Sequence, residues 1–177
     1  TVIISGSSIN NLHGLNVLTA IDGNLEVNST QYLPSLIGLD NLTYIGGDLI
    51  IIYNQALTGL AGLQNLVTVG SSISIHDNNT LMSLSALSSL ETSSLADLAI
   101  YENPILSDCS IQGICDYLSA PNGHVDIYNN FPGCNNAPDI AEECGFTLSC
   151  LPYGDYYFMS QSDINSFRRT IPAAPRC

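Results

Sequence analysis

Apolar residues recur along this chain in columns 23 to 25 residues apart, and these columns predict a stack of similar strands. The first column opens each row and holds Val2, Leu25, Leu49, Ile73 and Leu98. The second column, two positions later, holds Ile4, Val27, Ile51, Ile75 and Ile100. Residues two apart on a strand point to the same side, so we expect both columns to face a core. A shorter sixth row starts at Val125. A fixed period of this length is typical of a solenoid.

Leucines follow each strand at a spacing of three. The third row shows the pattern with Leu57, Leu60, Leu63, Leu66 and Val69. This spacing fits neither the period of a strand nor that of an α-helix, and it predicts an extended or 3₁₀-like wall with one residue in three facing inward. Glycines such as Gly46-Gly47 and Gly70 close most rows. We expect them to permit a corner with positive φ.

An asparagine stands five positions after the start of several rows. The members of this column are Asn54, Asn78, Asn103 and Asn130. An amide side chain at a bend can bond backbone groups that the turn leaves unpaired. Stacked in register, these side chains are predicted to form a buried ladder.

The repeat breaks at Cys109, and the sequence after it predicts a cap. Ile111, Ile114 and Leu118 are spaced as on one face of a helix, and Pro138 stands near the start of a second short helix. Six cysteines allow 15 pairings. Among these we favour the three pairs Cys109–Cys134, Cys115–Cys144 and Cys150–Cys177. A zinc site is disfavoured because closely set ligand pairs such as C-x₂-C are absent.

Composition narrows the class of protein. The chain has 177 residues, 45% of them hydrophobic, yet no apolar run is long enough to span a bilayer, so we expect no membrane insertion. The net charge is −13 and there is no lysine, which argues against a nucleic-acid partner or an anionic membrane surface. An even number of cysteines in such a chain predicts an oxidising, extracellular location, secreted or at the cell surface.

The rows resemble those of a known family. Segments such as "LTYIGGDLIIIYNQALTGLAGLQNL" and "CSIQGICDYLSAPNGHVDIYNNFPGCN" are similar to bacterial extracellular leucine-rich proteins of the Bacteroidetes type. More distantly, they resemble the L domains of the insulin and epidermal-growth-factor receptors. The likeness covers residues 2–144 and departs from the pattern at Ser93-Ser94. It implies a β-solenoid, a right-handed β-helix of leucine-rich or receptor-L-domain type with about six coils. It carries no catalytic residue onto this chain.

The resemblance also bears on domain organisation. In the bacterial family a segment like "SQSDINSFRRTIPAAPRC" commonly precedes the first strand, whereas here it comes last. We therefore expect solenoid coils over 1–108, a disulfide cap over 109–149 that includes a sixth strand at 125–130, and a cap over 150–177 belonging to the next solenoid of a tandem array. The only cations are expected at the contact between such modules: Arg168, Arg169 and Arg176. The partners would be further copies end to end, covalently continuous or docked.

Candidate catalytic and metal sites are weak. His76 and Asp77 could form half of an acid–base pair, but neighbours on a strand point to opposite faces, and we expect no catalysis. Asp77, Glu102 and Asp126 stand near bends in successive rows, which leaves calcium as an open alternative to solvated turn residues. No other cofactor or metal is expected.

The outward face of the strands is more informative. Strand alternation places Ile52, His76, Tyr101 and Tyr128 in one exposed column across four rows. Two functions follow. The first is a structural module of an extracellular fibre or surface adhesin, without catalysis. The alternative is a receptor-like binding domain that uses the exposed strand face to hold a cell-surface or environmental glycan, or a peptide.

Overall fold

The structure is a computed structural model that describes residues 1–148 and residue 161. Several expectations therefore lie outside the described residues. They are the Cys150–Cys177 disulfide, the cap over 150–177, and the positions of Arg168, Arg169 and Arg176.

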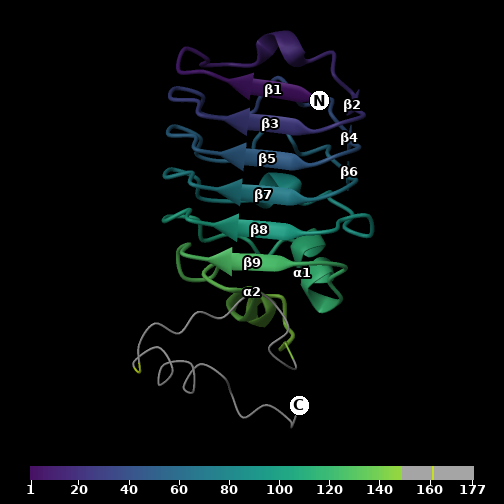
Figure 1. Cartoon of the computed structure of the whole chain (residues 1–177), viewed down its shortest axis with the longest axis vertical. Coiled ribbons are helices and arrows are strands. Elements are labelled where there is room, and N and C mark those ends of the chain that lie inside the picture. The colour runs from purple at the N-terminus through teal and green to yellow at the C-terminus, as the bar shows by residue number, and fades with distance from the viewer. Residues whose placement is uncertain (149–160, 162–177) are drawn as a thin grey trace.

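One strand from each of the six rows joins a single parallel sheet in chain order (Figure 1). The strands are β1 (Val2–Ser5), β3 (Leu25–Asn28), β5 (Leu49–Ile52), β7 (Ile73–His76), β8 (Leu98–Tyr101) and β9 (Val125–Tyr128). Their register matches the sequence columns, since Leu49 pairs with Ile73 and Ile51 with Ile75. The first and third residues of the four central strands are buried and the second and fourth are partly exposed. The predicted strand starts and the inward-facing columns are confirmed. The sixth strand, predicted over 125–130, ends at Tyr128 because Asn129 has positive φ.

The leucines at a spacing of three form the 3₁₀-like wall that the sequence predicted. The backbone N–H of Leu63 donates to the carbonyl of Leu60, and that of Leu66 donates to Leu63, each at 3.0 Å. The same bonds recur in other rows. Two of these rows contain a short 3₁₀ helix, η1 (His13–Leu15) in the first row and η2 (Ser85–Leu87) in the fourth. The leucines of rows two to four are thereby rotated into the core, which lies between this wall and the six-stranded sheet.

A second, smaller sheet was not predicted. It consists of β2 (Ala20–Ile21), β4 (Tyr44–Ile45) and β6 (Thr68–Val69), paired in parallel. The glycines that follow these strands do not have positive φ, so the predicted reason for them is wrong. Their role is close approach: a Cβ on Gly70 would lie 2.5 Å from the carbonyl oxygen of Gly46, and one on Gly46 equally close to that of Asp22.

Positive φ occurs instead directly after each strand of the large sheet. Gly6 has φ 133°, and five non-glycine residues have φ between 53° and 58°: Ser29, Tyr53, Asp77, Glu102 and Asn129. We call these five residues the rim. Left-handed backbone here turns the chain sharply at the end of the sheet and leaves the next residue, usually the ladder asparagine, inside.

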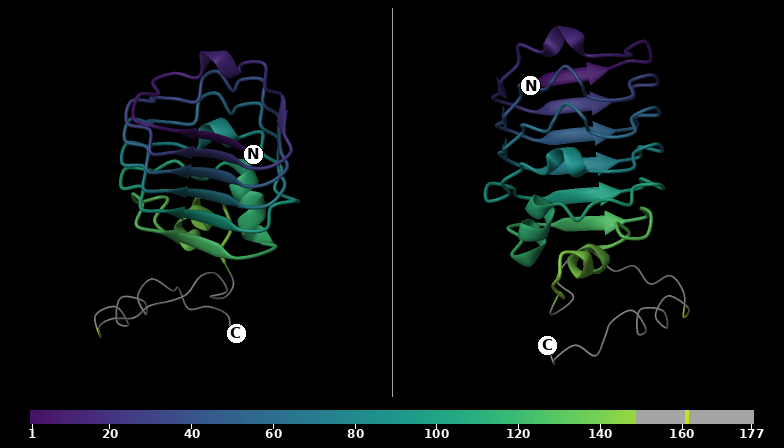
Figure 2. Two further views of the ribbon diagram at one scale, coloured as in Figure 1. Left: turned by 45° about the horizontal axis from the view of Figure 1, so that its top comes forward. Right: turned by 180° about the vertical axis from the view of Figure 1, so that it is seen from behind.

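The two expected cap helices are α1 (Gln112–Ser119) and α2 (Ala137–Glu143). Helix α2 lies across the C-terminal end of the stack beyond β9, and α1 lies beside the last rows (Figure 2). The Asn136 side chain caps α2 by accepting from the backbone N–H of Asp139 at 2.8 Å. Disulfides join Cys109 to Cys134 and Cys115 to Cys144, which are the two pairs favoured from the sequence. At the other end the first row is less enclosed, since Val2, Leu15 and Leu18 are only partly buried. No helix among the described residues has the length and apolar character to cross a membrane.

Candidate binding face

The outward column of the large sheet carries three rings in a continuous stack. Ladder pairing places Ile52, His76, Tyr101 and Tyr128 side by side at the last position of four successive strands. The His76 and Tyr101 rings lie 4.4 Å apart between centroids, and the Tyr101 and Tyr128 rings 4.8 Å apart, with both interplanar angles at 7°. We call these four residues the aromatic column. Its spacing follows that of parallel strands, because each ring stands on its own strand.

Stacking determines which surfaces of the rings a ligand can reach. Both faces of the Tyr101 ring are covered by its neighbours, so this ring offers its edge and hydroxyl group to solvent. Tyr128 belongs to the last strand and its ring has one stacked partner among the described residues. It is 44% exposed. The column therefore presents ring edges and hydroxyl groups along its length and a ring face at one end.

The rim extends the column, which the sequence did not lead us to expect. Tyr53 is 50% exposed and contacts the His76 ring edge-on, with centroids 5.8 Å apart. The signal was present in the sequence as a column of residues just before each ladder asparagine, but strand alternation alone does not show where these side chains point.

His76 and Asp77 form a pair, contrary to our expectation that they face opposite sides. The His76 Nδ1 lies 2.8 Å from the Asp77 Oδ2. The reason is the left-handed φ of 57° at Asp77, which ends the strand and breaks its alternation. Within the aromatic column this contact holds the imidazole ring, whose two other neighbours are Tyr53 and Tyr101.

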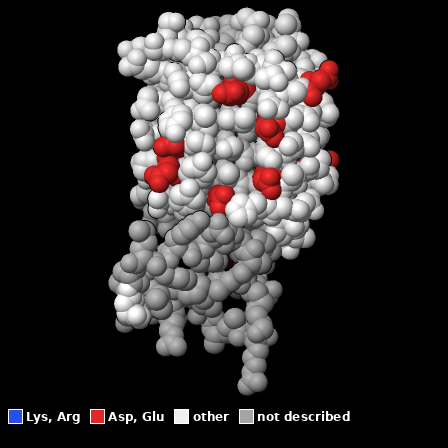
Figure 3. Space-filling model, in the orientation of Figure 1, with Lys and Arg blue, Asp and Glu red and all other residues white. Residues whose placement is uncertain are grey.

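Asp77, Glu102 and Asp126 lie near the tyrosine rings. Residues 1–148 contain no lysine or arginine, and the face seen in Figure 3 carries only acidic charges. Burial, and after it the Tyr128 phenol and the Asp77 carboxylate, raise the pKa of Tyr101 above its usual 10.0. Burial, then Asp126 and Glu102, raise the pKa of Tyr128 in the same direction. Both phenols are therefore uncharged at physiological pH and can donate as well as accept hydrogen bonds.

The three acids considered as calcium ligands each contact a different partner. Asp77 pairs with His76, Glu102 accepts from the Asn129 Nδ2 at 2.8 Å, and Asp126 lies 3.2 Å from the His124 Nε2. Asp126 also lies on strand β9, not at the bend where we placed it. Across the part of the chain that the structure describes, no group of three or more His, Cys, Asp and Glu residues is arranged to hold a metal ion.

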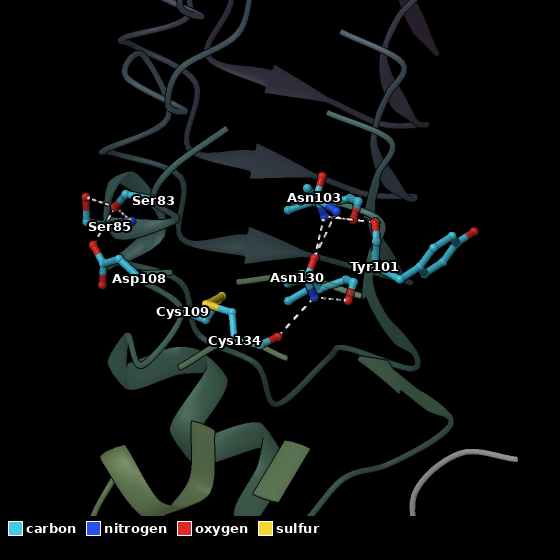
Figure 4. Close-up of a disulfide and its surroundings, with 10 residues drawn as sticks. Ser83, Ser85, Tyr101, Asn103, Asp108, Cys109, Asn130 and Cys134 are labelled. Atoms are coloured by element: carbon cyan, nitrogen blue, oxygen red, sulfur yellow. Dashed lines mark hydrogen bonds between the residues drawn. A yellow bond between two sulfur atoms is a disulfide. The ribbon is translucent and has the colours of Figure 1, made fainter. Parts of the chain in front are cut away.

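Behind the column, the asparagine ladder fixes the ends of the strands (Figure 4). In each step the backbone N–H of one asparagine donates to the Oδ1 of the next row, as Asn78 does to Asn103 at 3.1 Å. The Nδ2 groups donate back to strand carbonyls, that of Asn78 to Ile51 at 2.9 Å. Asn54, Asn78 and Asn103 are fully buried and Asn130 is nearly so. At the last step the Nδ2 of Asn130 donates to the carbonyl of Cys134.

A second polar ladder precedes the strands and was missed by the sequence analysis. Asn24 Oδ1 accepts from the N–H of Asp48, whose Oδ1 accepts from the N–H of Ser72. The Asp97 Oδ1 likewise accepts from the N–H of His124 at 2.7 Å. The sequence signal was a polar residue immediately before each strand. The two ladders hold both ends of every central strand, so the aromatic column stands on a rigid surface.

Comparison with known proteins gives one match. The model of a protein family described as Receptor L domain matches residues 1–137, which include the six strands, both ladders and the aromatic column. No curated protein and no solved structure matches the chain.

Proposed function

Because the chain belongs to the receptor L domain family over residues 1–137, we propose that it is an extracellular binding domain whose aromatic column holds a polypeptide ligand. The supporting observation is the stack of His76, Tyr101 and Tyr128, partly exposed along its length and exposed at Tyr128, on a sheet held at both ends. Tyrosine is enriched at the energetic centres of protein interfaces because it offers a large rigid area with a polar tip.

A peptide suits this surface better than a glycan, which our sequence analysis kept open beside it. A sugar ring packs flat against the face of an aromatic ring. Stacking covers both faces of Tyr101 and leaves only the end face of Tyr128 for such a contact. A peptide needs no such face. It can contact ring edges with apolar side chains while its backbone amides bond the tyrosine hydroxyl groups.

The extracellular location is supported by the two disulfides and by the family, since such bonds persist in oxidising compartments. Membership of a family of receptor domains also supports a role without catalysis. We further propose that the rows close into about six right-handed coils, with the domain boundaries given above. The first four coils have 23 to 25 residues, and the fifth, from Leu98 to Val125, has 27. The fibre module and its end-to-end partners stay a prediction, because the residues on which they depend lie outside those described.

The proposal is tested by selecting binders from a random peptide display library and, in parallel, by probing a glycan array with the same protein. We expect peptides whose affinity falls at least about fivefold in Tyr101→Ala. The matched control is Tyr44→Ala, which removes an exposed tyrosine from β4 of the small sheet and should change nothing. Glycan binding without peptide binding, or equal effects of the two variants, would refute the proposal. Thermal melting of each variant verifies that it is folded.

A further inference from the structure

The end of the aromatic column differs from its middle. Tyr128 is stacked on Tyr101 at 4.8 Å and has no second ring partner among residues 1–148. It lies on β9, the last strand of the sheet, and is 44% exposed. The electron-rich face of a phenol ring attracts cations when it is open to them. Tyr128 is therefore the position in the column where a ligand cation can meet a ring face.

Two carboxylates stand beside this ring from different elements. Asp126 precedes it by two residues on the same face of β9, and Glu102 lies on the rim of the neighbouring row. The backbone N–H of Glu102 donates to the carbonyl of Tyr128 at 3.2 Å. After burial, the Asp126 and Glu102 carboxylates raise the pKa of the Tyr128 phenol, in keeping with this placement. Each engages one carboxylate oxygen in the contacts described above, with His124 and Asn129 respectively.

The wider field has the same sign. Residues 1–149 carry 14 Asp and Glu residues and no lysine or arginine. A surface with such a charge attracts cationic partners and repels anionic ones, and the attraction is screened by salt.

We propose that the Tyr128 end of the aromatic column binds an arginine side chain from an extended segment of a partner protein, with the guanidinium stacked on the ring and paired with Asp126 and Glu102. This inference rests on the proposed function and names the chemistry of its ligand.

Arginine fits better than lysine for a geometric reason. A guanidinium is planar, so it can lie parallel to a ring while its N–H groups, which point outward in the same plane, donate to carboxylates at the ring's margin. An ammonium is a compact, strongly hydrated charge that cannot satisfy both contacts in this way. The surface is thus expected to distinguish two ligands of equal charge.

The experiment compares three fluorescein-labelled peptides of alternating sequence, (Arg-Ser)₄, (Lys-Ser)₄ and (Glu-Ser)₄, by fluorescence anisotropy with the full chain at low salt. We expect the arginine peptide to bind, the lysine peptide to bind about threefold more weakly, and the glutamate peptide not to bind. Tyr128→Leu should reduce the arginine affinity to that of the lysine peptide. Tyr128→Phe, which keeps the ring, should preserve the difference.

Charge variants test the carboxylates. Glu102→Gln combined with Asp126→Asn should weaken binding of the arginine peptide roughly fivefold. The matched control, Glu91→Gln combined with Glu142→Gln, removes two exposed acids elsewhere and should have little effect. Equal effects of the two pairs, equal binding of arginine and lysine peptides, or no binding of either would overturn the inference. Selected peptides that lack arginine yet depend on Tyr101 would leave the proposed function standing while this inference fails.

Discussion

At the scale of single residues, the Asn78 side chain makes five hydrogen bonds in the ladder, as many as the Asn103 side chain does. The Asn78 Oδ1 accepts from both the backbone N–H and the Nδ2 of Asn54, and its Nδ2 donates to the carbonyls of Ile51 and His76. Asn78→Ala would leave several of these buried groups unpaired. Since one unsatisfied buried group costs ~1–3 kcal/mol, we expect a loss of unfolding free energy at or above the upper end of that range, measured by urea denaturation.

The adjacent Asn79 provides the control. It is exposed, and its Nδ2 donates to the Gln55 side chain at 3.1 Å. Asn79→Ala should cost less than about 0.5 kcal/mol, as surface substitutions usually do. Similar losses for the two variants would mean that the buried ladder does not contribute to stability as its hydrogen bonds indicate.

For single residues, the sequence predicted the placement of a side chain correctly where that placement follows from the repeat period. The prediction was wrong where the placement depends on one backbone angle. The buried asparagines and the outward aromatic column both follow from a period that the sequence displays. The His76–Asp77 contact does not, because it depends on the positive φ of Asp77, and aspartate adopts that conformation only where the surrounding turn demands it. The ring stacking of Tyr101 was likewise invisible, since register alone does not fix side-chain rotamers.

At the scale of elements, Gly70 is one of the positions where neighbouring rows approach closely. A Cβ there would lie 2.5 Å from the Gly46 carbonyl oxygen, which is backbone and cannot turn aside. Gly70→Ala should push β6 away from β4 and destabilise the protein by about 1–3 kcal/mol, as overpacking typically does. The loss is measured as a shift of the urea midpoint. Gly59→Ala is the matched control because a Cβ at Gly59 meets nothing within 4 Å. A stable Gly70→Ala variant would contradict the close approach.

The small sheet explains why its glycines were misinterpreted. Its strands have two residues each, too short to show an alternating pattern, so the sequence gives no sign of a sheet there. Without that sheet, the available reason for a recurring glycine was a corner with positive φ. With it, the reason is the distance between paired backbones, which only tertiary structure reveals.

At the scale of the whole molecule, stacking was predictable because every row must bury its apolar face against the next. The two helices of the C-terminal cap followed from the break in the pattern at Cys109. The two disulfides found there are pairs that we favoured among the 15 possible pairings, and the break alone did not determine them. The ligand of the aromatic column could not be predicted from the sequence, because a strand face carries the same residue types whether or not it binds a partner.

In a stack, each row is stabilised by its neighbours, so unfolding is expected to start at an end. The carbonyl of Cys134 accepts from Asn130, whose Oδ1 accepts from the N–H of Asn103, so the Cys109–Cys134 disulfide secures the last step of the ladder. Replacing both cysteines by serine should destabilise the cap by about 2–4 kcal/mol. We expect faster amide hydrogen exchange at 103–134, with protection kept in strands β3 and β5.

The matched control replaces Cys115 and Cys144 by serine. Their disulfide joins α1 to the end of α2 and has no such link to the asparagine ladder, so amide exchange at Asn103 should rise less in this variant. Uniform loss of protection along the stack, or equal exchange at Asn103 in the two variants, would show that the ladder is not secured through Cys134.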